Sequence, residues 1–205
     1  MDSQLFFVVF LFALVMVVTP GPNNIMLMAS GLNYGARRTI PHAFGIILGV
    51  PVMTLAVGFG LGKLFIFAPA LHQFIKVAGI AYLLYLAWCI ANANTNTNEI
   101  KGEELNEGSQ PLTLLQALLF QWVNPKAWVM VVGAISTYTS DNILVEIFII
   151  ALCFFCAAFF STSLWTLCGA VLSKIITTVR YRLVFNRLMG VLLVLSILPM
   201  INAAL

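Results

Sequence analysis

Charge is scarce in this sequence: only 8% of its 205 residues are Asp, Glu, Lys or Arg, while 61% are hydrophobic. Soluble domains carry roughly 25% charged residues, so the composition excludes an ordinary water-soluble protein. It also excludes nucleic-acid binding, which requires many positive side chains. Apolar runs long enough to cross a bilayer recur along the chain, which indicates a polytopic membrane protein.

Metal-ligating and redox side chains are equally sparse, with 2 His and 4 Cys. No cluster of His, Asp or Glu offers ligands for a metal ion, and we predict no cofactor and no enzymatic activity. The cysteines lie in apolar runs, where cysteine usually behaves as a small hydrophobe. Residues 1–18 lack a basic segment and a small-x-small cleavage site. We therefore interpret them as the start of a mature helix, with a removed signal peptide as the alternative.

The apolar runs predict an all-α membrane protein with six transmembrane helices. The predicted spans are Leu5–Leu32, Ile40–Gly62, Phe74–Ala91, Leu112–Thr137, Ile143–Leu172 and Leu183–Ala203. One long polar stretch, Asn92 to Gln110, separates the third span from the fourth. It divides the chain into a first three-helix repeat (1–92), a polar cytoplasmic linker (93–110) and a second three-helix repeat (111–205).

Lysines and arginines predict the orientation, because they concentrate in cytoplasmic loops. With the N-terminus outside, two basic residues fall in outer connections, Lys63 and Lys76. The inner loops then hold Arg37, Arg38, Lys101, Lys174, Arg180, Arg182 and Arg187. This asymmetry predicts that both termini lie outside.

Each predicted half contains a proline-rich break in its first span. An odd number of spans per half gives the halves opposite orientations, so the repeat must be inverted. Pro22 of "TPGPNN" and Pro125 of "QWVNPKAW" fall near the middle of the first and fourth spans. Broken helices at matching positions of an inverted repeat mark the binding site of many transporters. The alternative is that both prolines produce kinks that serve only packing.

Local chemistry at the breaks predicts a polar pocket inside the apolar bundle. Asn124 suits a helix N-cap, and Pro125 suits the first turn that follows. The half-helix beginning there should expose free N–H groups and the positive end of its dipole. Pro20 should end the first half-helix, Gly21 allows the turn, and Pro22 restarts the helix. We predict that the pocket is formed by Thr19, Pro20, Gly21, Pro22, Asn23, Asn24, Gln121, Asn124, Pro125 and Lys126.

Lys126 is the one charge predicted deep in a span, which makes it a functional candidate. With the neighbouring helix N-terminus it could attract a carboxylate; the alternatives are snorkelling to the interface and an internal pair. The asparagines could bind a zwitterion, or act only as caps. Carbonyls around Val18 and Thr19 could receive an ammonium group.

The motifs "TPGPNN", "IMLMASGLNYGARR", "AGIAYLLYLAW" and "FQWVNPKAW" resemble the lysine exporter/homoserine-threonine exporter family of amino acid efflux carriers. Within it, the chain is most similar to the branch that exports small neutral amino acids such as cysteine and O-acetylserine. The resemblance implies a bacterial inner-membrane protein that expels amino acids, such as these or threonine and homoserine, by proton antiport. Many members carry an acidic residue early in the second span. This chain has Val50 and Pro51 there, which argues against a cationic substrate.

The missing carboxylate leaves the proton carrier to other groups. His42 titrates in the physiological range and Glu146 begins the fifth span, although both also suit simple interfacial positions. "CFFC", Cys153 to Cys156, suggests a rival function as a membrane thiol–disulfide conduit. An ion or metal exporter of similar architecture is a further alternative. The expected partners are an amino acid, protons and the bilayer, and a homodimer is compatible with so small a carrier.

Overall fold

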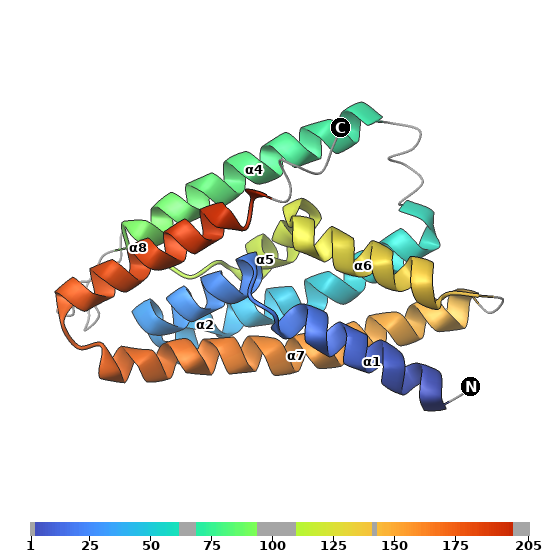
Figure 1. The fold of residues 1–205 in the computed structure, drawn as a ribbon, viewed down its shortest axis with the longest axis horizontal. Coiled ribbons are helices and arrows are strands. Elements are labelled where there is room, and N and C mark those ends of the chain that lie inside the picture. The colour runs from blue at the N-terminus through green and yellow to red at the C-terminus, as the bar shows by residue number, and fades with distance from the viewer. Residues whose placement is uncertain (1–2, 62–68, 94–109, 141–142, 199–205) are drawn as a thin grey trace.

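The computed structural model describes residues 3–61, 69–93, 110–140 and 143–198. Within these ranges the chain is helical apart from short connections and contains no strand (Figure 1), which confirms the predicted all-α class. The elements are α1 (Ser3–Val18), α2 (Pro22–Ala56), the π-helix η1 (Val57–Leu61), α4 (Pro69–Ala91), α5 (Leu114–Phe120), the 3-10 turn η4 (Gln121–Val123), α6 (Pro125–Tyr138), α7 (Ile143–Ile175) and α8 (Val179–Leu195).

Helix α2 turns back on itself at Gly35, which has a positive φ of 80° that favours glycine. The hydroxyl groups of Ser30 and Thr39, on either side of the turn, are hydrogen-bonded at 2.9 Å. Thr39 also donates to the Gly35 carbonyl at 2.9 Å. We call residues 22–34 the first arm of α2 and residues 36–56 its second arm.

Helix α7 lies along one side of the bundle and packs against α2 and α1 (Figure 1). Gly31 of the first arm and Gly169 of α7 face each other so closely that a Cβ on either would overlap backbone of the opposite helix. In the second arm, a Cβ on Gly45 would overlap α5, and one on Gly49 would approach Gln121 to 2.8 Å. Small residues therefore permit these close crossings.

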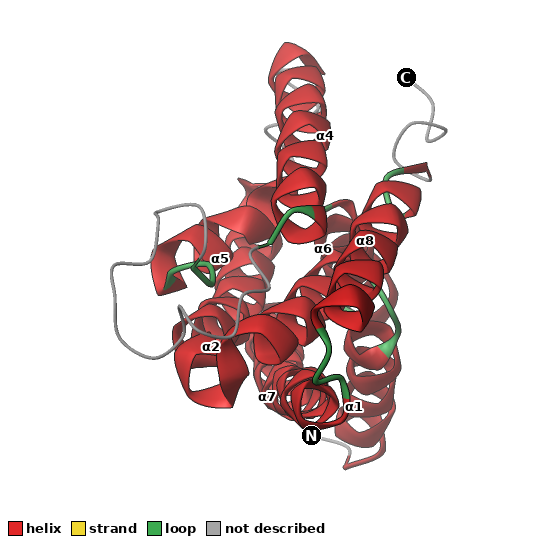
Figure 2. Cartoon of the chain, turned by 90° about the vertical axis from the view of Figure 1, so that its left-hand side faces the viewer, coloured by secondary structure: helices red, strands yellow, loops and turns green. Residues whose placement is uncertain are grey.

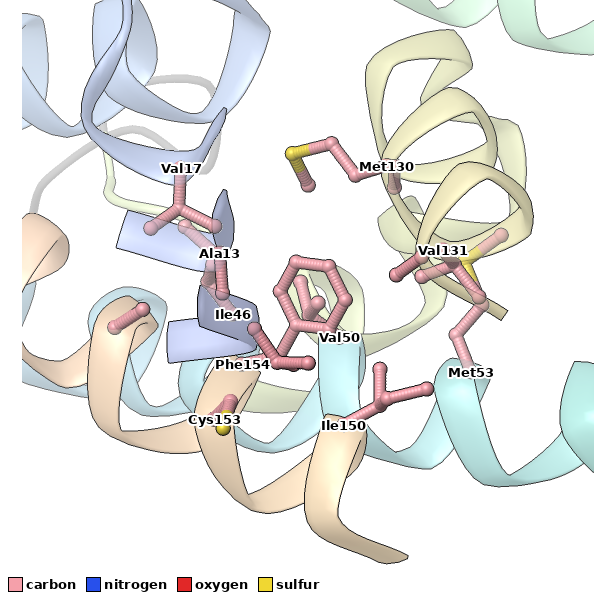
Figure 3. Close-up of a cluster of buried hydrophobic side chains, with 14 of the residues drawn as sticks. Ala13, Val17, Ile46, Val50, Met53, Met130, Val131, Ile150, Cys153 and Phe154 are labelled. Carbon is pink, nitrogen blue, oxygen red and sulfur yellow. The ribbon is translucent and has the colours of Figure 1, made fainter. Parts of the chain in front are cut away.

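Two apolar clusters surround the helix breaks. The first joins α1, the second arm, α6 and α7, and includes Val17, Ile46, Val50, Met130 and Phe154 (Figure 3). The second joins α4 and α8 to the first arm, through residues such as Leu83, Leu86, Phe185, Met189 and Leu193. Figure 2 shows α4 on the side of the bundle opposite α7, with the arms of α2 between them.

In the described ranges, three helical stretches are long and apolar enough to cross a membrane: Pro22–Leu61, Gln73–Ala91 and Ile143–Ile175. A fourth is obtained if Leu114–Val123 and Pro125–Tyr138, which meet at 68°, form one bent span. The shorter apolar helix Phe6–Val18 ends at the first break. These findings identify a chain with several membrane-compatible helices.

The predicted six spans are not confirmed as such, and they correspond to these elements as follows. The second half of the predicted first span and nearly all of the second form the two arms of α2. Helix α8 begins at Val179, before the predicted sixth span, and its first residues include Arg180 and Arg182. The linker 93–110, apart from its two end residues, and the last residues of the sixth span lie outside the described residues.

Candidate functional site

The first break separates α1 from α2, and Asn24 closes the end of α1. Helix α1 ends at Val18, and Gly21, in an extended conformation, precedes the first helical residue of α2. The side-chain amide of Asn24 donates to the carbonyl oxygens of Val17 at 2.7 Å and Thr19 at 2.9 Å. Carbonyl groups at a helix end have no partner within the helix. Asn24 therefore supplies a donor to groups that the helix itself leaves unpaired.

Donors from two other helices reach the same end of α1. Ser161 Oγ and Trp165 Nε1 of α7 donate to its last carbonyl groups at 2.8 and 3.1 Å. Lys126 Nζ of α6 donates to both oxygens of Thr19, the carbonyl oxygen and the hydroxyl oxygen, and its distance to the hydroxyl oxygen is 2.8 Å. It also donates to the Pro20 carbonyl at 3.4 Å. A cation is favourable at the negative end of a helix dipole. Side chains from α2, α6 and α7 thus hold the end of α1 together.

The second break lies between η4 and α6. Asn124 is the N-cap of α6, and its side-chain oxygen accepts from the backbone N–H of Lys126 at 3.2 Å. The Asn124 carbonyl accepts from the N–H groups of Ala127 and Trp128, at 3.0 and 3.3 Å. Pro125, at the first helical position, has no N–H to satisfy. The predicted cap is present, and it occupies the first amide groups of α6.

Direct contacts connect the two breaks. The side-chain amides of Asn23 and Gln121 form a reciprocal pair, with hydrogen bonds of 2.9 and 3.2 Å. Gln121 is fully buried and also donates to the Ala117 carbonyl at 2.9 Å. Gly21 lies against the Lys126 stem, where a Cβ would come within 2.7 Å of Lys126 Cδ. Residues about 100 positions apart in the chain therefore form one polar centre.

A small, partly open pocket lies at this centre. Its polar lining includes Asn23, Asn24, Asn124, Lys126, Ser161 and Thr162. Val17, Ile46, Val50, Met130 and Ala158, which belong to or adjoin the cluster in Figure 3, form its apolar wall. Within the described residues, this lining has one cationic side chain and no carboxylate. The pocket is suited to a small ligand with a negative group, and a cationic side chain would find no counter-charge there.

The N-terminus of α2 opens at the pocket without a cap. Gly21 has no side chain to accept from the first-turn N–H groups, and Pro22 has no N–H of its own. The backbone N–H groups of Asn23 and Asn24 are assigned no acceptor among the described residues. An uncapped helix N-terminus favours anions through its N–H groups and its dipole. The ammonium group of Lys126, close to Gly21, adds a positive charge on the same side of the pocket.

Two details of the predicted site are wrong. The carbonyl groups of Val18 and Thr19 are not available to an ammonium group, because each already accepts from two protein donors. The free N–H groups expected at α6 are occupied by Asn124, and the open helix end is that of α2. Of the ten predicted residues, five line the pocket: Gly21, Asn23, Asn24, Asn124 and Lys126. The other five, Thr19, Pro20, Pro22, Gln121 and Pro125, lie at the breaks but are not among its lining residues.

Sequence reasoning missed the contribution of α7. Ser161, Thr162 and Trp165 of α7 either line the pocket or bind the end of α1. The one sequence signal for this role is "STSLW", a group of hydroxyl side chains and a tryptophan inside a long apolar helix. Polar residues inside membrane helices usually face another helix or a cavity, so this stretch was a detectable candidate.

The predicted proton groups lie elsewhere. His42 is buried and lines a second pocket. Glu146 accepts from the backbone N–H and the hydroxyl of Ser140 near the start of α7, so it is engaged locally. Cys153 is buried in the apolar core, whereas Cys156 is exposed, and both are free thiols. The described residues contain no group of three His, Cys, Asp or Glu side chains that could hold a metal ion.

Comparison with known proteins agrees with this architecture. The chain matches the family described as "LysE type translocator" over residues 14–197. Proteins named "Cysteine/O-acetylserine efflux protein" from Escherichia coli strain K12 and Shigella flexneri serotype 5b (strain 8401) are 31% identical to it over 128 residues. This match covers 62% of the chain and 62% of each relative's length. No solved structure matches the chain. Because the family match covers nearly the whole sequence, the chain belongs to the LysE type translocator family, a family of transport proteins rather than enzymes.

Proposed function

We propose that this protein exports small neutral amino acids, such as cysteine, O-acetylserine, threonine or homoserine, from the bacterial cytoplasm. The observation that carries the proposal is the pocket at the two breaks, where Lys126 and the uncapped N-terminus of α2 lie together. These groups suit the carboxylate that all amino acids share. The names of the relatives support the same class of substrate.

The lining also supports the choice of a zwitterion. A bound carboxylate would lie against the N–H groups of Asn23 and Asn24, next to the ammonium of Lys126. The substrate ammonium group needs acceptors, and Asn124 Oδ1 and the hydroxyl oxygens of Ser161 and Thr162 line the same pocket. Because no carboxylate in this lining could pair with a cationic side chain, lysine and arginine would bind poorly.

Substrate binding would compete with the contacts that hold α1 to α6. Without ligand, the three donors of the Lys126 ammonium are directed at the carbonyl and hydroxyl of Thr19 and the Pro20 carbonyl. A carboxylate is a stronger partner than these neutral oxygens. Its arrival would draw Lys126 away from α1 and loosen one side of the pocket. This competition couples substrate binding to the opening that alternating access requires.

We further propose the membrane arrangement. Six spans result if α1 and the first arm of α2 together form a broken first span, and the second arm of α2 forms the second span. Helix α4, the bent pair of α5 and α6, helix α7 and helix α8 are the remaining four. Three spans on each side of the 93–110 linker would be related as an inverted repeat. The positive-inside rule then places both termini in the periplasm and the linker in the cytoplasm of an inner-membrane protein.

Proton antiport and a homodimer belong to the same proposal as expectations. His42 and Glu146 remain the candidates for carrying the proton. Export against a concentration gradient would then depend on the proton gradient, and a protonophore would abolish accumulation. Crosslinking in native membranes would report the dimer.

The test is efflux from proteoliposomes that contain the purified protein and are preloaded with labelled serine, threonine, cysteine or lysine. We expect accelerated release of the neutral amino acids and little release of lysine. Lys126→Met should reduce neutral release about tenfold or more, because it removes the positive charge from the pocket. Lys174→Met, at the exposed end of α7, is the matched control and should behave like the wild type. Correctly inserted wild-type protein that releases none of these amino acids would refute the proposal.

A further inference from the structure

A second, partly open pocket lies between the two arms of α2, helix α4 and residues 110–112. Met26, Leu86 and Ile90 contribute apolar surface to it. The polar groups in its lining include the side chains of Ser30, Tyr34 and His42. It shares no lining residue with the pocket at the breaks.

His42 is the unusual member of this lining. Only 1% of its surface is exposed, yet neither ring nitrogen has a hydrogen-bond partner among the residues that the structure describes. A neutral imidazole offers one donor and one acceptor. Leaving both unsatisfied in the interior is unfavourable, and such groups in folded proteins usually have a partner. Because His42 belongs to the lining of this pocket, a small ligand bound there can supply that partner.

The neighbouring polar groups are already paired among themselves. Asn33 forms a reciprocal amide pair with Asn186 of α8, with hydrogen bonds of 2.8 and 3.1 Å. Because Thr39 donates its hydrogen to the Gly35 carbonyl, Ser30 must donate to Thr39 and keeps its lone pairs free to accept. The remaining polar groups in the lining are the two nitrogens of His42, an acceptor on Ser30, the hydroxyl of Tyr34, the thiol of Cys89 and the side-chain amide of Gln110. None carries a formal charge when the imidazole is neutral, which suits a ligand with no net charge.

The two pockets follow one another along the seam between the arms of α2. Asn23 and Asn24 of the first arm face the break pocket together with Ile46 and Val50 of the second arm. One to two turns further along each arm, Ser30 and His42 line the second pocket. Beyond it the arms meet at Gly35, next to the exposed Arg37 and Arg38. The positive-inside rule places such arginines on the cytoplasmic side.

We propose that the His42 pocket is a second binding site, which takes up the same small neutral amino acid on the cytoplasmic side before it reaches the pocket at the breaks. The inference rests on the proposed function, because it assumes the same substrate. The His42 imidazole donates to the substrate carboxylate or accepts from its ammonium or hydroxyl group. Ser30 accepts a further hydrogen bond. Each transport cycle then begins with a molecule already held next to the break pocket.

The test is the binding stoichiometry of labelled serine and threonine on purified protein, measured by equilibrium dialysis. We expect two molecules per chain for the wild type and one for His42→Phe, which keeps the volume of the ring and removes both nitrogens. His42→Gln, which retains a donor and an acceptor, should keep the second molecule with affinity reduced by less than about tenfold. Lys126→Met should lose the other molecule and keep the one at His42.

The control is Thr54→Val, a buried polar residue in the same arm that lines neither pocket. It should bind two molecules, which separates loss of a site from general damage to α2. Binding of a single molecule to the wild type would overturn the second site and leave the proposed function intact. Two molecules bound to a folded His42→Phe protein would overturn the role of His42. Absence of any binding to the wild type would instead refute the proposed function.

Discussion

Replacing Gly21 with alanine should impair transport by displacing Lys126. The backbone of Gly21 is extended, with φ of −177° and ψ of 179°, so an alanine adopts it without strain. The added Cβ would nevertheless lie 2.7 Å from Lys126 Cδ and 3.2 Å from Nζ. Carbon atoms normally approach to about 3.5–4.0 Å, so the lysine stem must move by roughly 1 Å.

That movement disturbs the hydrogen bonds from Lys126 to Thr19 and Pro20. A hydrogen bond to a charged group contributes about 1.5–3 kcal/mol. Loss of one such bond therefore predicts a decrease of roughly tenfold to a hundredfold in the efflux rate. We expect an efflux rate reduced by at least about tenfold in proteoliposomes, with protein still present in the membrane. A substitution of Gly133, in α6, is the matched control, since a Cβ there meets nothing within 4 Å. Gly133→Ala should transport like the wild type.

A double variant tests the cause. If the effect of Gly21→Ala acts through Lys126, the combination with Lys126→Met should be no slower than Lys126→Met alone. Wild-type efflux in Gly21→Ala would refute the argument that the lysine must occupy this position. Additive losses in the double variant would refute the link between the two residues, even if Gly21→Ala itself is slow.

Three further predictions concern the contacts around the breaks. Asn24→Leu should lower the unfolding free energy by about 1–3 kcal/mol, because the carbonyl groups of Val17, Val18 and Thr19 each lose one of their two donors. Thermal denaturation in detergent, compared with the exposed Asn92→Leu, measures the loss. Asn33→Leu or Asn186→Leu alone should destabilise the protein, because each removes one partner of the buried amide pair. The double variant should lose less unfolding free energy than the two single variants added together, and additive losses would contradict the pairing. Gly31→Val should prevent the close contact of α2 with α7 and reduce the yield of folded protein. Gly133→Val is the control and should be tolerated, so equal yields of the two variants would contradict the packing argument.

The local chemistry of the breaks could be predicted from the sequence because it depends on neighbours in the chain. The N-cap at Asn124 follows from an asparagine before a proline at the first helical position. The helix start at Pro22 follows from the same rule. Lys126 was identifiable because a lysine in an apolar span is expensive unless something binds it.

What could not be predicted depends on residues distant in the chain. Nothing near Gly45 or Gly31 in the sequence says which helix approaches each glycine. The pairing of Asn23 with Gln121 and of Asn33 with Asn186 requires the packed bundle. The same holds for the donors that α7 supplies to α1, since Ser161 and Trp165 are separated from Val17 and Val18 by 144 and 147 positions.

Three helix ends meet at the break pocket: the C-terminus of α1, the N-terminus of α6 and the N-terminus of α2. Differences in how these ends are capped give the pocket its polarity. The C-terminus of α1 would present negative carbonyl groups, but donors from α2, α6 and α7 already bind them. The N-terminus of α6 would present positive N–H groups, but Asn124 accepts from them. Only the N-terminus of α2 has first-turn N–H groups without an assigned acceptor among the described residues, and Lys126 lies beside it. An anionic group therefore finds the unsatisfied partners in this pocket, and an ammonium group must bind to side-chain oxygens. For an amino acid this fixes the direction in which it lies: its carboxylate faces the start of α2, and its side chain extends toward the apolar wall.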